Sequence, residues 1–190
     1  MVGSRPHAGP GLIRIIGGRW RGRRIQVPDV PGLRPTPDRI RETLFNWLQP
    51  IVSGARCLDL FSGSGALAFE ALSRGAAEVV AVERDATAVT ALKHSAAILQ
   101  VEGLQIHQAA ASVFLAGPPR PFDVVFLDPP FDSELLPEIQ VQLTTGWLAT
   151  PAWIYLECAP GQERGELPGG WDQRRQKRAG DVIYRLVRSD

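Results

Sequence analysis

A glycine-containing turn between a short apolar segment and an Ala/Leu-rich segment constrains this chain more than any other feature. The stretch Cys57–Leu72 has the sequence CLDLFSGSGALAFEAL. Its first five residues predict a buried strand, the next four a tight turn, and the remainder a helix. Gly63 and Gly65 carry no Cβ, so the backbone can turn sharply there and approach a ligand at the helix N-terminus. The sequence therefore predicts a ligand site over the end of this strand.

Strand and helix patterns alternate along the rest of the chain. Apolar runs predict further strands at 78–83, 104–107, 122–127, 152–158, 171–178 and 181–188, and helical patterns fall at 37–48, 85–101, 112–115 and 133–143. Thr36 is a candidate N-cap of the first helix, with Pro37 at the first helical position. Such alternation predicts an α/β fold with a doubly wound, mostly parallel seven-stranded sheet, whose last two strands form an antiparallel pair at one edge.

The N-terminal part of the chain is basic. Residues 1–56 carry ten arginines against three acidic residues, although the net charge of the whole chain is only +1. Leu12–Ile16 and Trp20–Val27 predict an N-terminal β-hairpin extension around a Gly-Gly turn. We interpret residues 1–35 as a basic hairpin arm with a proline-rich connector, and residues 36–190 as the main domain.

Guanidinium groups suit contacts with phosphates, and an aromatic ring among them suits stacking on an unpaired base. The candidate RNA-binding residues of the arm are Arg14, Arg19, Trp20, Arg21, Arg23, Arg24 and Arg34. The alternative is a solvated edge strand kept soluble by its charge. The clustering of the arginines favours the nucleic-acid interpretation.

Two carboxylates accompany the glycine turn. Asp59 lies just before the end of the first strand, and Glu83 ends the next strand, 18 positions after Gly65. A spacing of about 20 residues is typical of an acid that binds ribose hydroxyls. These residues predict an adenosine-containing cofactor. Gly63-x-Gly65-x-x-Ala68 also matches the fingerprint of NAD(P)-dependent oxidoreductases, so that class stays open.

The tetrapeptide Asp128-Pro129-Pro130-Phe131 directly follows the strand at 122–127. Ligands of a doubly wound sheet lie at the carboxyl ends of its strands, so this segment should open onto the crevice of the glycine turn. The prolines lack N–H donors, which leaves the Asp128 side chain and the Pro129 carbonyl as acceptors. They could hold an exocyclic amino group, and Phe131 could stack on its ring. A rigid turn is the alternative.

Composition limits the remaining classes. A chain of 190 residues with 44% hydrophobic content can form one well-buried domain with a small appendage. Residues 1–11 lack an apolar signal-type core, and no apolar run approaches about 18 residues, so we expect a cytoplasmic protein without membrane insertion. Cys57 and Cys158 show no CxxC pairing, so we expect neither a disulfide nor a metal site. A monomer is the default expectation.

The loop 59–65, the acid Glu83 and the segment 128–131 resemble Rossmann-like S-adenosylmethionine-dependent methyltransferases that modify exocyclic amino groups. More closely, the segments RIIGGRWRG at 14–22, LRPTPDR at 33–39 and RETLFNWL at 41–48 resemble the RsmD family, and the similarity runs from about Leu12 through Val187. The resemblance implies methylation of N2 of a guanine in bacterial small-subunit (16S) ribosomal RNA, S-adenosyl-L-methionine as cofactor, and an assembling ribosomal particle as partner. DPPF also occurs in adenine and cytosine methyltransferases, so adenine N6 or cytosine N4 is the alternative acceptor.

The resemblance also implies site residues. The cofactor-binding set is Thr36, Arg39, Asp59, Phe61, Gly63, Gly65, Glu83, Arg84 and Ala110, and the catalytic set is Asp128, Pro129, Pro130 and Phe131. Asp59 would lie near the methionine part of the cofactor and Glu83 at its ribose, while Thr36 and Arg39 would close the pocket. Where the family often has an Asp or Asn at the adenine amine, this chain has three alanines at 109–111. Either a backbone group near Ala110 or apolar packing would then hold adenine.

Overall fold

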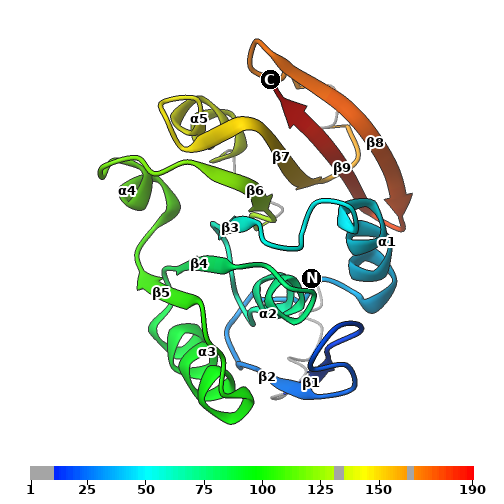
Figure 1. The fold of residues 1–190 in the computed structure, drawn as a ribbon, viewed down its shortest axis with the longest axis vertical. Coiled ribbons are helices and arrows are strands. Elements are labelled where there is room, and N and C mark those ends of the chain that lie inside the picture. Colours follow the sequence, from blue (N-terminus) through cyan, green and yellow to red (C-terminus); the bar gives the residue numbers. More distant parts are fainter. Residues whose placement is uncertain (1–10, 131–134, 162–164) are drawn as a thin grey trace, which may run out of the picture.

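The structure is a computed structural model that describes residues 11–130, 135–161 and 165–190. Its centre is a seven-stranded sheet with the order β5-β4-β3-β6-β7-β9-β8 (Figure 1). The strands are β3 (Arg56–Asp59), β4 (Glu78–Glu83), β5 (Leu104–Gln108), β6 (Phe122–Leu127), β7 (Leu148–Cys158), β8 (Trp171–Ala179) and β9 (Val182–Ser189). Strands β3 to β7 pair in parallel with one another, whereas β9 is antiparallel to both β7 and β8. The predicted doubly wound sheet with an antiparallel edge pair is confirmed.

Helices cover both faces of this sheet. They are α1 (Asp38–Leu48), α2 (Ala66–Ser73), α3 (Ala86–Leu99), α4 (Ala111–Leu115) and α5 (Leu135–Leu143). Side chains of α1, α2 and α3 share one apolar cluster with one face of the sheet, and those of α4 and α5 share a second cluster with the other face. Burial on two faces explains why β4 and β6 are almost continuously apolar in sequence.

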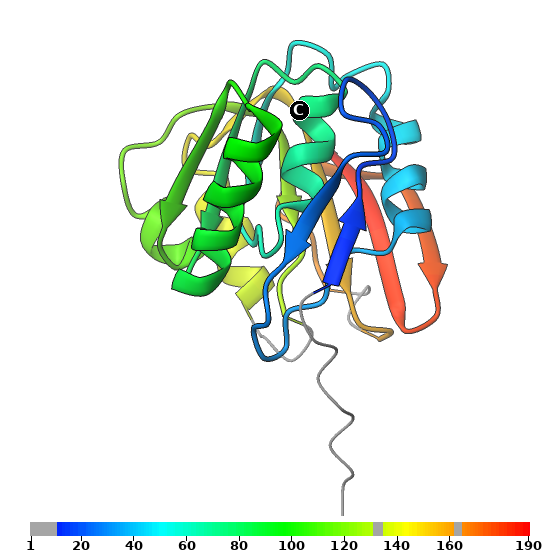
Figure 2. The ribbon, with the colours of Figure 1, turned by 90° about the horizontal axis from the view of Figure 1, so that it is seen from below.

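The N-terminal hairpin forms a separate two-stranded sheet. Strand β1 (Gly11–Arg14) pairs antiparallel with β2 (Arg24–Val27), and both are shorter than predicted because residues 15–23 form an irregular connection. In Figure 2 the hairpin, in blue, lies alongside the main domain, and Ile15 and Ile25 belong to the core cluster that contains α1 and α2. The hairpin therefore shares the core of the domain. The division of the chain at residue 35 stays a prediction.

Trp20 is part of that shared core. Only 7% of Trp20 is exposed, and its backbone N–H donates a 2.9 Å hydrogen bond to the hydroxyl of Ser73 on α2. The neighbouring guanidinium of Arg19 lies 5.7 Å from the centre of the indole ring. The expectation that Trp20 offers a stacking surface to a base is wrong, because the ring is buried against apolar side chains.

Three general features of the described residues bear on function. No helix among them is long and apolar enough to cross a membrane. Cys57 and Cys158 are both buried. Within the same residues, no group of three or more His, Cys, Asp or Glu side chains is arranged to hold a metal ion.

Candidate active site

A cavity of about 760 Å³ lies at the carboxyl ends of the central strands. Strand β3 is the point where the topology changes direction, because β4 pairs on one side of it and β6 on the other. Ligands of doubly wound sheets bind at such a switch point. The predicted site residues that line the cavity are Arg34, Thr36, Asp59, Phe61, Gly63, Glu83, Arg84, Ala110, Asp128, Pro129 and Pro130. The structure thus brings together segments more than 90 positions apart.

Three residues of the predicted cofactor-binding and catalytic sets are not in this lining. Arg39 is an exposed residue of α1 and does not line the cavity, and its role in closing the pocket stays a prediction. Gly65 also lies behind the lining: a Cβ on it would fall 2.5 Å from Leu92 and 2.6 Å from Phe69, so it serves close packing of the loop. Phe131 lies outside the described residues.

The glycine loop is held by the acid at the end of β4. Gly63 has a φ of +51°, which favours glycine, and its N–H donates a 2.8 Å hydrogen bond to Oε2 of Glu83. The second carboxylate oxygen, Oε1, accepts a 2.8 Å hydrogen bond from the N–H of Asp85. Glu83 therefore fixes the loop and also lines the cavity, where its remaining lone pairs can accept from a ligand.

Asp59 is the most unusual polar group of the site. It is 1% exposed, and neither carboxylate oxygen has a hydrogen-bond partner among the described residues. Burial, followed by the charge of Asp128, raises the pKa of Asp59 to about 7. A buried carboxylate without a partner costs free energy unless a ligand donates to it. Asp59 is thus prepared for a cationic or hydrogen-bond-donating ligand.

Asp128 directly contacts the N-terminal segment. Its Oδ2 accepts a 3.0 Å hydrogen bond from the hydroxyl of Thr36. Thr36 was expected to cap α1, but the N-cap is Pro37, and no side chain caps that helix. Burial raises the pKa of Asp128 to about 6 against the opposing effect of hydrogen bonding, of which the bond from Thr36 is the larger contribution. The Thr36 hydroxyl therefore stabilises the ionised form of Asp128.

Glu157 and Tyr155 were not predicted as site residues. Glu157 is 4% exposed on β7, and the Tyr155 hydroxyl donates a 2.5 Å hydrogen bond to its Oε1. Burial, followed by the charge of Asp128, raises the pKa of Glu157 to about 9. The signal in the sequence was a single carboxylate inside the apolar run Ile154–Cys158. Apolar residues missed by sequence reasoning also line the cavity, among them Leu33, Leu135 and Ile139.

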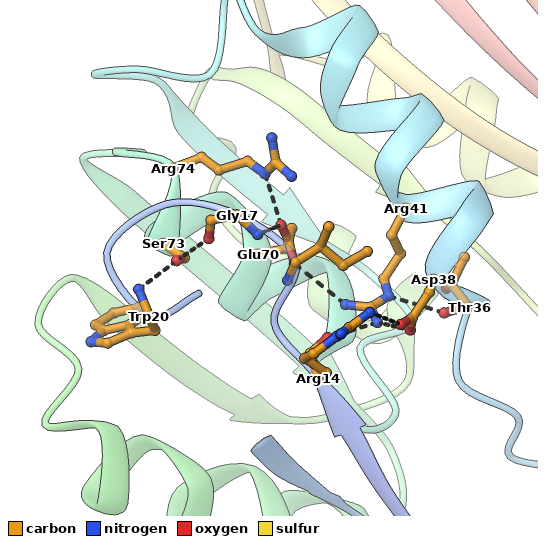
Figure 3. A network of polar contacts seen from close by, with 10 residues as sticks. Arg14, Gly17, Trp20, Thr36, Asp38, Arg41, Glu70, Ser73 and Arg74 are labelled. Carbon is orange, nitrogen blue, oxygen red and sulfur yellow. Dashed lines mark hydrogen bonds and ion pairs between the residues drawn. The ribbon is translucent and has the colours of Figure 1, made fainter. Parts of the chain in front are cut away.

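A buried ion pair connects the site to the hairpin (Figure 3). The Arg41 guanidinium on α1 lies 3.3 Å from the Glu70 carboxylate on α2, with the two side chains 1% and 0% exposed. Arg41 also donates from Nε to the carbonyl of Thr36 at 3.1 Å, and from Nη2 to the carbonyl of Arg14 at 2.9 Å. The Asp38 carboxylate accepts a further hydrogen bond of 2.5 Å from Nη2. One side chain thus joins β1, α1 and α2.

Glu70 holds the turn that follows β1. Its two carboxylate oxygens accept hydrogen bonds of 2.9 Å from the N–H of Ile16 and 2.8 Å from the N–H of Gly17. Arg74 donates to it from Nε at 2.8 Å. A carboxylate buried among four donor groups is a satisfied charge, so the network can hold the hairpin in one position.

The arginines proposed to bind RNA are exposed. Arg14, Arg19, Arg21, Arg23, Arg24 and Arg34 all have exposed side chains. Arg14 pairs with Asp38 at 3.4 Å, and Arg23 donates to the carbonyl of Ile98 at 3.2 Å. Arg34 lies in the loop that lines the cavity, which places one of these cations beside the site. Their role in RNA binding stays a prediction.

The sheet order, the glycine loop after β3, the acid at the end of β4 and the Asp-Pro-Pro segment after β6 define a Rossmann-like methyltransferase fold. The model of the family described as "Conserved hypothetical protein 95" matches residues 13–188. With the relatives below, this match shows that the chain belongs to that family, the RsmD family.

The relatives cover nearly the whole chain. Ribosomal RNA small subunit methyltransferase D of Escherichia coli (strain K12) is 48% identical over 185 residues, which cover 97% of this chain and 93% of that protein. The protein of the same name from Haemophilus influenzae is 42% identical over 184 residues, covering 94% and 95% of the two chains. The solved structure of yhhF from Escherichia coli matches with a TM-score of 0.89 and 44% identity, over 95% of this chain and 99% of that one.

Proposed function

We propose that this protein transfers a methyl group from S-adenosyl-L-methionine to the exocyclic N2 amine of a guanine in small-subunit (16S) ribosomal RNA. The observation that carries the proposal is the half-buried Asp128 carboxylate, which lines the same cavity as the glycine loop and Glu83. The names of the relatives support ribosomal RNA as the substrate class.

The residues of the cavity fit the proposed cofactor. Asp59 is a buried carboxylate that lacks a partner among the described residues, and the ammonium group of a methionine moiety would satisfy it. Glu83 has free lone pairs for ribose hydroxyls. The alanines at 109–111 also line the cavity, and a backbone group or apolar packing there would hold the adenine ring. When bound, S-adenosyl-L-methionine supplies an electrophilic sulfonium methyl group.

The acceptor side follows from the chemistry of an aromatic amine. Its nitrogen lone pair is delocalised into the ring, so the amine is a poor nucleophile. Asp128 and the Pro129 carbonyl can accept hydrogen bonds from its two N–H groups and hold it in one orientation. Alignment of this kind can remove a large part of the activation barrier to methyl transfer. Positive charge develops on the nitrogen as it reacts. The Asp128 carboxylate stabilises that charge and takes the proton.

The RNA must present the base outside its stack. A stacked and paired guanine cannot place its amine in a buried cavity, so the nucleotide has to be unpaired or flipped out. Phe131 follows the two prolines in sequence and is the proposed stacking platform. The exposed arginines of the hairpin are the proposed contacts to RNA phosphates. We propose that a monomer acts on RNA within an assembling ribosomal particle.

One assay tests this function. Labelled S-adenosylmethionine is offered to small-subunit ribosomal RNA, with and without its ribosomal proteins, and the product nucleosides are then identified. Label in N2-methylguanosine supports the proposal, and label in N6-methyladenosine or N4-methylcytidine would move the acceptor to another base. Calorimetry with S-adenosylhomocysteine and NADH separates the cofactor classes, because binding of NADH alone would favour an oxidoreductase.

A further inference from the structure

Two carboxyl groups meet at the ends of neighbouring strands. Strands β6 and β7 are parallel, and Leu127 lies opposite Leu156. The next residues of the two strands, Asp128 and Glu157, therefore lie side by side, and alternation of side chains places them on the same face of the sheet. Tyr155 shares that face, because it lies two residues before Glu157. The register alone thus builds a small polar cluster beneath the acceptor side of the cavity.

Hydrogen bonds join this cluster. The strand register places the carboxyl groups of Asp128 and Glu157 side by side, so that one can donate a hydrogen bond to the other. Oε1 of Glu157 accepts from the Tyr155 hydroxyl at 2.5 Å, and Oδ2 of Asp128 accepts from the Thr36 hydroxyl at 3.0 Å. A hydrogen bond between two carboxyl groups needs one proton, and two adjacent buried carboxylates cannot both be ionised at little cost. The pair therefore carries one proton and one negative charge.

The surroundings decide which residue holds the proton. Asp128 lines the cavity and accepts a hydrogen bond from Thr36, which stabilises its ionised form, whereas Glu157 is 4% exposed and lies behind the cavity lining. Burial and the charge of Asp128 raise the pKa of Glu157. Two other titratable groups face the pair. Asp59 on β3 interacts electrostatically with Asp128, which disfavours a second negative charge on the Asp128–Glu157 pair, and Tyr184 on β9 lies opposite Glu157. The proton thus resides on Glu157.

We propose that Glu157 is a positioning residue of the acceptor site, a neutral carboxyl group that donates a hydrogen bond to Asp128 and keeps the negative charge of the pair on the oxygens of Asp128. Its effect on methyl transfer rests on the proposed function, whereas its protonation does not. Tyr155 holds the Glu157 carboxyl by its other oxygen, so that the acidic hydrogen points toward Asp128.

The proton balance follows from this arrangement. The amine nitrogen uses its lone pair to bind the methyl group and then carries one hydrogen too many. That proton passes to Asp128, and the charge of the pair changes from −1 to 0. Departure of the methylated base opens the cavity to water, which takes the proton and restores the ionised Asp128. Glu157 keeps its own proton throughout, so it is not the general base.

Two substitutions separate this role from a direct one. Glu157→Gln replaces the carboxylic acid by an amide with the same donor and acceptor, so we expect single-turnover methyl transfer close to wild type. Glu157→Ala removes the donor to Asp128, and we expect a rate about 10- to 100-fold lower, the factor expected when one hydrogen bond to a charged group is removed. The acid limb of the pH–rate profile should move to higher pH in Glu157→Ala only, because its Asp128 ionises less readily.

The proposal is overturned if Glu157→Gln is as inactive as Glu157→Ala, because Glu157 would then act as an ionised base. It is equally overturned if Glu157→Ala keeps the wild-type rate and profile. Thermal unfolding and calorimetry with S-adenosylhomocysteine show whether each variant is folded and binds the cofactor product. Should Glu157→Ala fail to fold, Tyr155→Phe replaces it, with a smaller loss of rate expected and an unchanged rate counting against the proposal.

Carboxyl NMR tests the protonation without any activity. With ¹³C-labelled glutamate, the Glu157 signal, assigned by its absence in Glu157→Gln, should stay in the protonated position at neutral pH. In Asp128→Asn it should titrate at lower pH than in wild type, since the charge of Asp128 is gone. A Glu157 signal that is ionised at neutral pH in wild type would reject the proposal even if the protein methylates RNA. An inactive wild type with a protonated Glu157 would reject only the proposed function.

Discussion

Arg41 and Glu70 form an ion pair of 3.3 Å in which both side chains are almost fully buried. The Arg41 guanidinium also binds the carbonyl of Thr36, whose hydroxyl binds Asp128. Glu70 in turn binds two backbone N–H groups after β1. A continuous set of polar contacts therefore runs from the hairpin to Thr36 (Figure 3), and the Thr36 hydroxyl continues it to Asp128 on the acceptor side of the cavity. This set fixes where the hairpin and Thr36 lie relative to the main sheet.

The first prediction concerns this ion pair. Glu70→Gln should lower the free energy of unfolding by about 3–5 kcal/mol, because it leaves the Arg41 charge buried without its partner. Urea unfolding measures the change, and Glu102→Gln, which alters an exposed glutamate, serves as the control. Equal stability of the two variants would mean that neighbouring acceptors such as Asp38 suffice to compensate Arg41.

The second prediction concerns the acceptor. Asp128→Ala should abolish methyl transfer while S-adenosylmethionine binding stays nearly intact, because Asp128 faces the target amine. Thr36→Val removes only the hydroxyl that donates to Asp128, so it should give a smaller decrease in rate. Single-turnover methylation measures the rate of methyl transfer, and calorimetry measures the affinity for S-adenosylmethionine. Wild-type turnover in Asp128→Ala would remove this residue from the mechanism.

The third prediction concerns the cofactor. Glu83→Ala should weaken S-adenosylmethionine binding by about 1–3 kcal/mol, the usual cost of removing a charged partner of hydroxyl groups. Part of that cost would come from the glycine loop, because Glu83 also binds the N–H of Gly63. Glu83→Gln keeps one acceptor oxygen for the loop and separates the two contributions. An unchanged dissociation constant in both variants would show that the ribose is held elsewhere.

The fold was predictable because its signals are local. The strands β4 and β6 are short apolar runs between turns, and the run of strands and helices indicates a doubly wound sheet whatever the exact boundaries. The same holds for the glycine loop and for the segment at 128–130. These are consecutive residues whose chemistry is visible in the sequence.

Long-range contacts were not predictable in the same way. The pattern Thr-Pro-Asp suggests an N-cap at Thr36, yet its hydroxyl binds Asp128, which lies 92 residues further on. Trp20 lies among arginines, and the sequence does not show that Ser73 and the core cover it. Glu157 joins the site only through the register of β7 against β6. In each case the contact depends on elements whose relative position no local pattern encodes.

The fourth prediction follows from the protonated Glu157. Its pKa is raised from 4.5 to about 9 in the folded protein, so the folded chain holds more protons than the unfolded chain between these values. The contribution of Glu157 to the free energy of unfolding is fully present at pH values below its pKa in the unfolded chain. It is lost as the pH rises toward its pKa in the folded protein. Wild type should therefore become less stable between about pH 5 and pH 8.5, and Glu157→Gln should change less. Urea unfolding at both pH values measures the free energy of unfolding of the two proteins. An equal decrease in wild type and in Glu157→Gln would contradict the protonation of Glu157.

The last prediction concerns the hairpin. Arg19, Arg21, Arg23 and Arg24 are exposed on one short segment, so replacing all four by Gln leaves the buried Ile15, Trp20 and Ile25 in place. Deletion of residues 1–28 would be a poorer test, because it removes those core side chains. For every RNA phosphate that the variant no longer binds, the slope of log K against log salt should fall by ~0.7–0.9. The variant should thus bind RNA more weakly and with a flatter salt dependence, at unchanged cofactor affinity.

A matched control lies on β8. Arg174, Arg175, Lys177 and Arg178 are also exposed, and their replacement by Gln removes the same charge from the opposite end of the chain. If the hairpin binds RNA phosphates directly, its variant should show a larger decrease in affinity and in salt dependence than the β8 variant. Equal decreases would indicate that only the total charge matters. An unchanged slope of log K against log salt in the hairpin variant, together with a smaller slope in the β8 variant, would indicate that the β8 edge binds the RNA instead.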